Sequence, residues 1–284
     1  NLETMNSMKK VALVLFSVII LSSCEKEGQL RVENNDIPLI SKVLINGEPY
    51  TEYTYNEANL VTEEKSKFQY TSHTYNDINL LLRSDFYWDI SLASSNSSVI
   101  EAAMNRKEWV NPFNTALSLS HSLEYKNNGE LYRRSFIRPS NSNLEYYEFT
   151  YENNRISRQT LYWQNFMSFY IDYEYDANGN MIKESNYFVS SGGNGKLRTT
   201  TEYEFDNKHN PFLAFKRLLS PGKYTNPNNI TKETYTVHSS QIDHWFSGPQ
   251  VTIKTYEYKY NSHGYPTKVN GNVEYIYKQI TRQR

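Results

Sequence analysis

The chain has 284 residues, with 30 basic and 31 acidic side chains and a formal net charge of −1 at pH 7. Proteins that bind nucleic acid usually carry a clustered basic excess, so this balance argues against a nucleic-acid partner. Aromatic residues make up 15% of the chain, with 25 Tyr and 13 Phe. Because these residues favour half-buried pleated surfaces, the composition predicts an all-β protein.

The N-terminus has the pattern of an export signal. Met8-Lys9-Lys10 gives a positively charged start, with Met5 as the other candidate first residue, and Val11 to Leu21 is apolar except for Ser17. A run of this length is shorter than the roughly 18 to 20 residues of a membrane-spanning helix and fits the apolar core of a signal peptide. We therefore predict a signal peptide of the lipoprotein type over residues 1–23.

The residues that follow indicate a lipid anchor. Leu21-Ser-Ser-Cys24 resembles a lipobox, and Cys24 is the only cysteine of the chain, so it cannot form an internal disulfide. We predict that Cys24 is the lipid attachment site and that residues 24–38 are the lipidated N-terminus and a tether. Glu25-Lys-Glu27 resembles an export tag, which implies an outer-membrane address facing the cell exterior, with the periplasmic face as the alternative.

A repeated unit organises the rest of the chain, and residues 172–184 are its clearest copy. Alternate residues up to Tyr175 are apolar or aromatic, as in a half-buried strand, and Asp176-Ala-Asn-Gly-Asn180 has the composition of a turn. The other copies are residues 53–60, 123–131, 149–156, 203–210 and 258–265. Four markers, Tyr125, Tyr151, Tyr175 and Phe205, are separated by 26, 24 and 30 residues.

This period fits a long hairpin with its connection. Residues 272–278 alternate in the same way without a following turn, so we expect a closing strand there. Residues 39–284 are predicted to form a single β-meander domain, an antiparallel meander of long hairpins that forms a barrel-like or strongly wrapped sheet.

Two regions interrupt the meander. Ser98-Val-Ile-Glu101 has the S-x-x-E form of a helix start, and Asn111-Pro112 would end the helix, so one short helical insertion is expected near residues 98–110. Pro221, Gly222 and Pro227 predict a loop over residues 219–229.

The tyrosine-bearing face is predicted to point into the protein. Thr255, Glu257 and Lys259 alternate with three tyrosines, so the opposite face is charged. A Lys at the midplane of a bilayer costs about 2 to 4 kcal/mol, which argues against a transmembrane barrel whose charged face meets lipid. The mean hydropathy of −0.73 agrees with a charged face in water.

The clearest repeat suggests a family. Tyr173-Glu-Tyr-Asp-Ala-Asn-Gly-Asn180 resembles the tyrosine-aspartate (YD) repeat of Rhs-type proteins, whose hairpins form β shells. Together with the lipobox, the degenerate repeats are similar to Bacteroidota-type surface lipoproteins of unknown function described as having a porin-like fold. The resemblance implies a fold and an address, and it brings no catalytic residues. A relative of an Rhs shell that encloses another polypeptide is a further hypothesis.

The chemical motifs are sparse. The six histidines form no HExxH pattern and no cysteine is left for a zinc site, so we predict no metal and no cofactor. Asp243-His244 lies near Ser239 and Ser240, but there is no G-x-S-x-G elbow, so we predict no catalytic residue.

These observations favour a non-enzymatic cell-surface lipoprotein, a structural or ligand-binding β scaffold with a glycan or a protein as its ligand. The alternative is a surface glycan-binding or glycan-processing protein, because exposed tryptophans stack against sugar rings. The candidate ligand-binding residues are Trp88, Trp109, Trp163 and Trp245.

Overall fold

Seventeen antiparallel strands, which follow one another along the described part of the chain, build the fold. The computed structural model describes residues 38–190, 194–218, 221–222, 224–238 and 249–278, which belong to one unit, Asn34–Arg284. The predicted signal peptide, Cys24, most of the tether and Trp245 lie outside the described residues.

The strands are short to medium in length. Their bounds are β1 Ile40–Ile45, β2 Glu48–Tyr55, β3 Val61–Lys65, β4 Gln69–Tyr75, β5 Leu81–Asp89, β6 Thr115–Tyr125, β7 Leu131–Arg138, β8 Asn141–Glu152, β9 Arg155–Trp163, β10 Phe166–Tyr175, β11 Met181–Phe188, β12 Lys196–Phe205, β13 Ile230–Val237, β14 Gln250–Thr255, β15 Tyr258–Tyr260, β16 Pro266–Val269 and β17 Val273–Tyr277.

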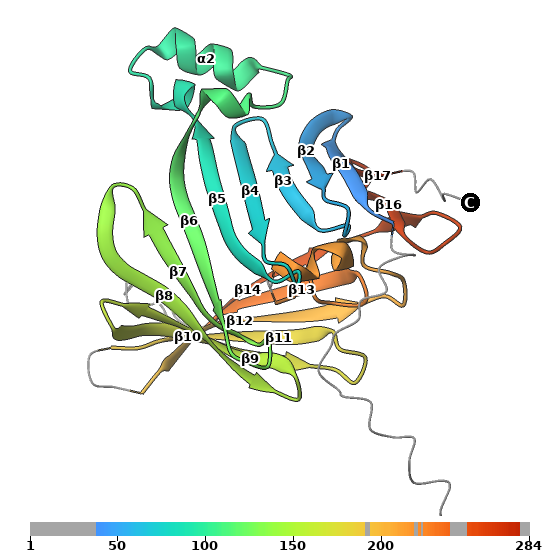
Figure 1. Cartoon of the computed structure of the whole chain (residues 1–284). Coiled ribbons are helices and arrows are strands. Elements are labelled where there is room, and N and C mark those ends of the chain that lie inside the picture. Colours follow the sequence, from blue (N-terminus) through green and yellow to red (C-terminus); the bar gives the residue numbers. More distant parts are fainter. Residues whose placement is uncertain (1–37, 191–193, 219–220, 223, 239–248, 279–284) are drawn as a thin grey trace, which may run out of the picture. The chain divides into compact units, whose positions relative to one another are not determined.

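Each strand pairs with the next one from β1 to β14 and again from β15 to β17, and β17 pairs back with β1 (Figure 1). The two ends of the sheet are therefore β14 and β15, and no ladder within the described residues joins them. The predicted all-β antiparallel meander is confirmed as a wrapped sheet, and the sheet does not close into a barrel. The predicted closing strand is β17.

The predicted helical insertion is present and shorter than expected. The helix α2 covers Ser97–Asn105, and its N-cap is Asn96, whose side chain accepts a hydrogen bond from the Ser98 amide. Three 3-10 helices were not predicted: η2 Ile90–Ala93, η3 Pro112–Asn114 and η4 Pro211–Leu218. None of the helices in the described part of the chain is both long enough and apolar enough to cross a membrane.

The repeat turns share one hydrogen-bond pattern. In the copy that begins at Asp176, the Asp176 amide donates to Asn180 O over 2.9 Å, and the Gly179 amide donates to Asp176 O over 3.1 Å. The fourth residue of this turn has a positive φ, which Gly and Asn tolerate best. Five turns are alike, with Asn59, Asn79, Gly129, Gly179 and Gly264 at this position. The Asn79 copy was not predicted from the sequence.

Two predicted copies depart from this turn. Residues 149–156 contain a two-residue turn in which Asn153 and Asn154 have φ values of 50° and 59°, as in a type I′ hairpin. At residues 203–210 the hairpin is opened by an excursion of the chain. Asp206 bonds to Asn229 as Asp176 bonds to Asn180, so the separation grows from 4 residues (180 − 176) to 23 (229 − 206).

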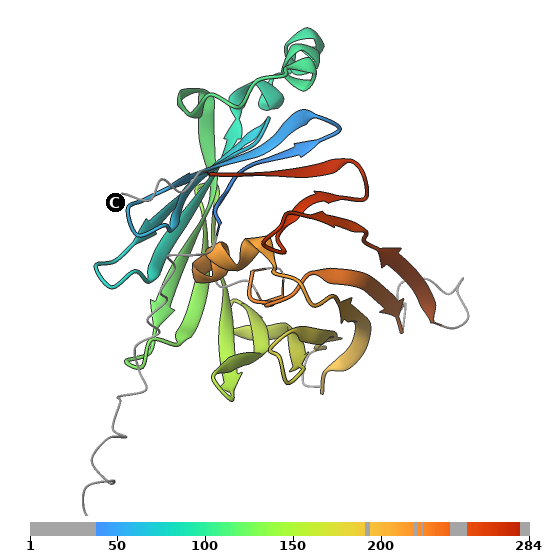
Figure 2. The same ribbon diagram turned by 90° about the vertical axis from the view of Figure 1, so that its right-hand side faces the viewer.

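The excursion fills the inside of the curved sheet. Figure 2 shows η4 in orange, enclosed by strands from both halves of the chain. Phe215 of η4 is 1% exposed, and its ring centroid lies 4.8 Å from that of Tyr53 on β2. The predicted inward direction of the tyrosine face is confirmed, because tyrosines of the repeats pack against both buried core clusters.

A row of tyrosine hydroxyls, which we name the tyrosine rim, fastens each outgoing strand to its neighbour. Tyr125 at the end of β6, for example, donates to the carbonyl oxygen of Leu81 at the start of β5 over 2.8 Å. The same contact to the preceding strand is made by Tyr55, Tyr75, Tyr175 and Tyr277. The rim also includes Tyr258 on β15, which donates to Ile230 O at the start of β13. Phe205 stands at this position on β12 and has no hydroxyl. At the start of neighbouring β11, the Asn226 side chain accepts from the Met181 amide instead.

Candidate functional site

The tryptophans predicted to form a binding surface lie apart. Trp88 on β5 is 48% exposed and Trp163 on β9 is 40% exposed, with three strands between them. Trp109 follows α2 and is half-buried. Within the described residues no ring contact joins any two of these three, so the proposed stacking surface is not assembled by them.

The inner face of the sheet instead carries a polar row that follows from the repeat. In six hairpins, the first residue of the outgoing inward face is paired with a polar or charged residue of the returning strand, whereas Tyr258 of the last copy pairs with Val269. Tyr53 faces Glu64, Tyr173 faces Glu184, and Tyr203 faces Glu233. We name these returning residues the inner polar row: Glu64, Ser84, Arg134, Gln159, Glu184 and Glu233.

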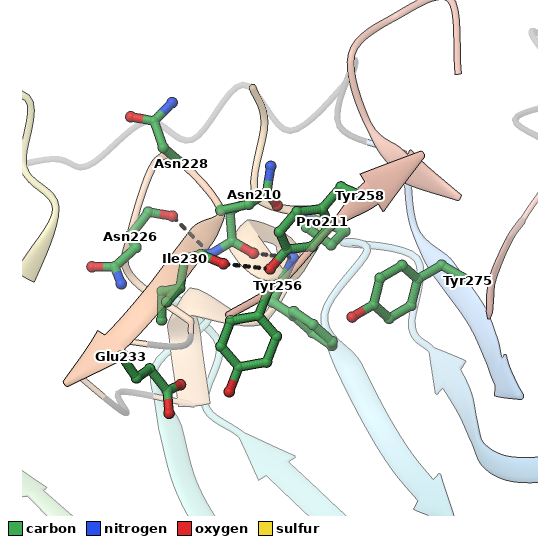
Figure 3. A pocket seen from close by; sticks show the side chains of 11 residues that line it. Asn210, Pro211, Asn226, Asn228, Ile230, Glu233, Tyr256, Tyr258 and Tyr275 are labelled. Atoms are coloured by element: carbon green, nitrogen blue, oxygen red, sulfur yellow. Dashed lines mark hydrogen bonds between the residues drawn. The ribbon is translucent and has the colours of Figure 1, made fainter. Parts of the chain in front are cut away.

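One end of this row opens into a cavity of about 170 Å³ (Figure 3). Its walls come from the excursion after β12, from β13, from the segment between β14 and β15, and from β17. The aromatic side chains that line it are Phe212, Tyr256, Tyr258 and Tyr275. The cavity lies between the excursion and β13.

Asparagines fix the wall that the excursion supplies. Asn210 accepts from the Phe212 amide, which starts η4, and donates its side-chain amide to Asn226 O over 2.8 Å. Asn228 bonds to Asn180 and to Lys208 O, which ties this wall to the repeat turn beside it. These side chains hydrogen-bond nearby backbone, which stabilises irregular loops where no ladder is available.

The polar groups of the cavity have distinct environments. Burial, followed by the hydrogen bond to Glu233, raises the pKa of Tyr256 to about 12, so the phenol stays neutral and donates to the carboxylate. Burial also raises the pKa of Tyr275 to about 12. The Tyr258 hydroxyl belongs to the tyrosine rim. Asn226 is 1% exposed, and its amide nitrogen has no hydrogen-bond partner among the described residues.

This arrangement suits a small polar molecule with a flat or ring-shaped body. Aromatic side chains form part of its wall, and Glu233 supplies an acceptor beside the Tyr256 hydroxyl. None of the described residues that line the cavity is a Lys, Arg or His, so the cavity offers no positive charge to an anion. A neutral ligand rich in hydroxyl groups therefore fits it better than a phosphate or a carboxylate does.

A second constellation spans β3, β4 and β5. His73 Nδ1 lies 2.9 Å from Ser84 Oγ, and His73 Nε2 lies 3.2 Å from Glu64 Oε1. These are the residue types of a hydrolase triad, but Ser84 is 5% exposed and His73 is 9% exposed, so a substrate cannot reach the serine. The group satisfies buried polar atoms of the inner face. In the described part of the chain, no three His, Cys, Asp or Glu residues are grouped to hold a metal ion.

Sequence reasoning missed the cavity residues for two reasons. Glu257 was assigned to the charged face, and it is exposed as expected. Glu233 lies on the other face, opposite Tyr203, and no spacing from the turn residue Asp206 indicated this, because the hairpin closes only at Asn229. Asn226 and Tyr275 come from segments far apart in the chain, and no local pattern links them.

Comparison with known proteins shows likeness only at the level of solved structures. No family model matches the chain, and no curated protein matches it. A porin-like protein from Bacteroides uniformis has 12% identity and a TM-score of 0.39, with 84% of this chain and 96% of that chain covered. A porin-like protein from Bacteroides vulgatus has 12% identity and a TM-score of 0.39, covering 86% and 100%.

The TcdB2-TccC3-Cdc42 structure has 17% identity and a TM-score of 0.29. The match covers 77% of this chain and only 9% of that one. At these TM-scores the likenesses carry no argument about function.

Proposed function

We propose that the chain is a lipoprotein of the outer membrane, anchored through Cys24 and facing the cell exterior, and that its wrapped sheet is a ligand-binding scaffold without chemistry of its own. The observation that carries the proposal is the sorting of side chains between the two faces of the sheet. Tyrosines of the repeats pack inward, whereas the outer face carries ion pairs such as Lys232 with Glu204, 2.7 Å apart. A body with a charged outer face reaches a membrane through an anchor, which the lipobox cysteine would supply.

Metabolic labelling with palmitate tests the anchor. The unaltered chain should incorporate label and fractionate with membranes, whereas Cys24→Ala should do neither. Ser23→Ala is the matched control, because it keeps the cysteine and a small residue before it. Equal labelling of Cys24→Ala and the unaltered chain would refute the anchor. Protease added to intact cells then distinguishes the exterior, where the folded body is cleaved, from the periplasmic face, where it is protected.

A second candidate function is the binding of a glycan at the cavity, in place of the tryptophan surface. Its volume of about 170 Å³ supports this. An engineered cavity of about 150 Å³ in another protein holds benzene, so there is room here for one six-membered ring. Aromatic faces beside a carboxylate and a phenol are the groups that pack against a sugar ring and bind its hydroxyls.

Calorimetric titration of the full chain with a panel of neutral monosaccharides tests this candidate. Tyr256→Ala should weaken binding at least about tenfold, a loss of about 1.4 kcal/mol. Tyr235→Ala on β13 should leave it unchanged, because Tyr235 is 41% exposed and does not line the cavity. If Trp88→Ala abolishes binding and Tyr256→Ala does not, the ligand binds at Trp88 and not in the cavity. Release of reducing sugar from neutral oligosaccharides that stops in Glu233→Gln would identify processing instead of binding.

A further inference from the structure

The free edge of β14 is the strongest feature of the described chain that the proposed function leaves unused. All six residues of Gln250–Thr255 are exposed, although the strand is fully extended and paired with β13. Val251 and Ile253 are both 57% exposed. Long exposed edge strands are uncommon because their unpaired backbone groups bind other strands, and proteins usually protect them with proline, a bulge or an inward charge.

The hydrogen bonds around the strand show which backbone groups face outward. The Tyr256 amide donates to Thr231 O of β13 over 2.8 Å, whereas Thr255 O accepts from the Asn270 side chain on the opposite side. Backbone groups alternate in direction along a strand, so those of Val251 and Ile253 point away from β13. Within the described residues these two amides and two carbonyls have no partner. The β13–β14 ladder is regular over all six pairs.

We propose that β14 pairs with β14 of a second copy of this chain across a two-fold axis, which joins two sheets edge to edge. A two-fold axis perpendicular to the sheet makes the two strands antiparallel, as every neighbouring pair in this sheet already is. With the axis at Thr252, the outward backbone groups of Val251 in one copy lie opposite those of Ile253 in the second copy. By symmetry, the outward backbone groups of Ile253 in the first copy lie opposite those of Val251 in the second. Both pairs then form hydrogen-bonded positions of one ladder.

The sequence of the strand is self-complementary in this register. Val251 and Ile253 of both copies lie on the same face, so four apolar side chains that are exposed in one copy cover each other. Lys254, the only charged residue of the strand, lies opposite Gln250 and does not meet the second Lys254. Like charges directly opposite would be destabilising, so the charge pattern favours a second copy in this register. The pairing needs neither the lipid anchor nor a ligand in the cavity.

Cysteine cross-linking tests the pairing in the full chain that carries Cys24→Ala, so that the introduced cysteine is the only thiol. Thr252 would face Thr252 of the second copy at a non-hydrogen-bonded position, where Cα atoms lie about 4.5 Å apart, within the range for a disulfide. Thr252→Cys should form disulfide dimers at least about tenfold faster than Ser262→Cys, an exposed turn residue away from the edge. Equal rates would overturn the proposal.

A charge at the centre of the edge gives an independent test. Ile253→Lys should abolish fast cross-linking of Thr252→Cys, because it places an ammonium among the apolar side chains of the second copy. The matched control is Ile78→Lys, since Ile78 is 71% exposed in a turn and leaves the edge intact. Near-ultraviolet circular dichroism verifies that both variants are folded. Cross-linking that survives Ile253→Lys, or that is lost equally in Ile78→Lys, would overturn the proposal.

Discussion

The tyrosine rim makes a prediction that separates the role of a hydroxyl from the role of a ring. Tyr125→Phe keeps the aromatic ring in the core cluster and removes only the bond from the Tyr125 hydroxyl to Leu81 O, which is 2.8 Å long. Leu81 is 2% exposed, so water cannot easily replace the lost donor. A hydrogen bond of this kind contributes about 1 kcal/mol, and a buried acceptor left without a partner costs about 1 to 3 kcal/mol. We expect Tyr125→Phe to lower the free energy of unfolding by about 1 to 2 kcal/mol.

Chemical unfolding followed by near-ultraviolet circular dichroism measures this change, and a thermal melt gives a second estimate. In a protein of this size, each kcal/mol corresponds to about 2 to 4 °C in the melting temperature. The matched control is Tyr235→Phe, because Tyr235 is 41% exposed and its hydroxyl is outside the rim. Its free energy of unfolding should change by less than about 0.5 kcal/mol.

Tyr277→Phe extends the test to the other end of the sheet, where the acceptor is Pro266 O. The two rim tyrosines share no partner, so the double variant should show the sum of the single effects within about 0.5 kcal/mol. If Tyr125→Phe and Tyr235→Phe cost the same, the hydroxyls do not fasten the strands and the rim is only a packing feature.

Three further predictions concern charge. Burial, followed by the charge of Arg134, lowers the pKa of His121 from 6.5 to about 4. Between these pH values the folded state binds fewer protons than the unfolded state, so the folded state is destabilised as the pH falls. His121→Phe should make the free energy of unfolding fall less from pH 7 to pH 4 in urea titrations; an unchanged slope would contradict this. Arg106→Met leaves the carboxylate of Asp89, which is 2% exposed, without its cation and should cost about 3 kcal/mol in the same assay. Lys107→Met breaks only an exposed pair and should cost less than about 1 kcal/mol, and equal losses would refute the distinction. Burial raises the pKa of Tyr175 from 10 to about 12, so stability should fall as the pH rises between these values. Tyr175→Phe should make this fall smaller in urea titrations, and an unchanged slope would contradict the burial of the phenol.

The sequence predicts the meander well because its signals are local. A period-2 strand and an Asn- or Gly-containing turn lie within a dozen residues, as in the copy around Asp176. The excursion at Asp206 could not be predicted, because its closing partner Asn229 lies 23 residues away and no local pattern marks the pair. A loop was predicted over residues 219–229, whereas the packing of η4 inside the curve of the sheet was not predicted.

The candidate site also depends on contacts between distant segments, which the sequence does not predict. Glu233 could not be placed on the tyrosine face by counting from the repeat turn, because its position follows from the Asp206–Asn229 closure. Which wall faces it depends on how η4 and β17 meet across the sheet, and that depends on packing between distant segments. The tryptophans were chosen for their chemistry alone, and Trp88 and Trp163 prove to lie on strands that are not neighbours.

The bonds between Asp206 and Asn229 have a consequence for how such a protein can change over generations. They close the hairpin whatever lies between them, and the entropy of closing a loop grows by only about 0.6 kcal/mol for each doubling of its length. Insertions and deletions inside this segment can therefore reshape the interior while the strand register on either side is preserved. A library of loops that replace this segment could therefore give the same sheet many differently shaped cavities.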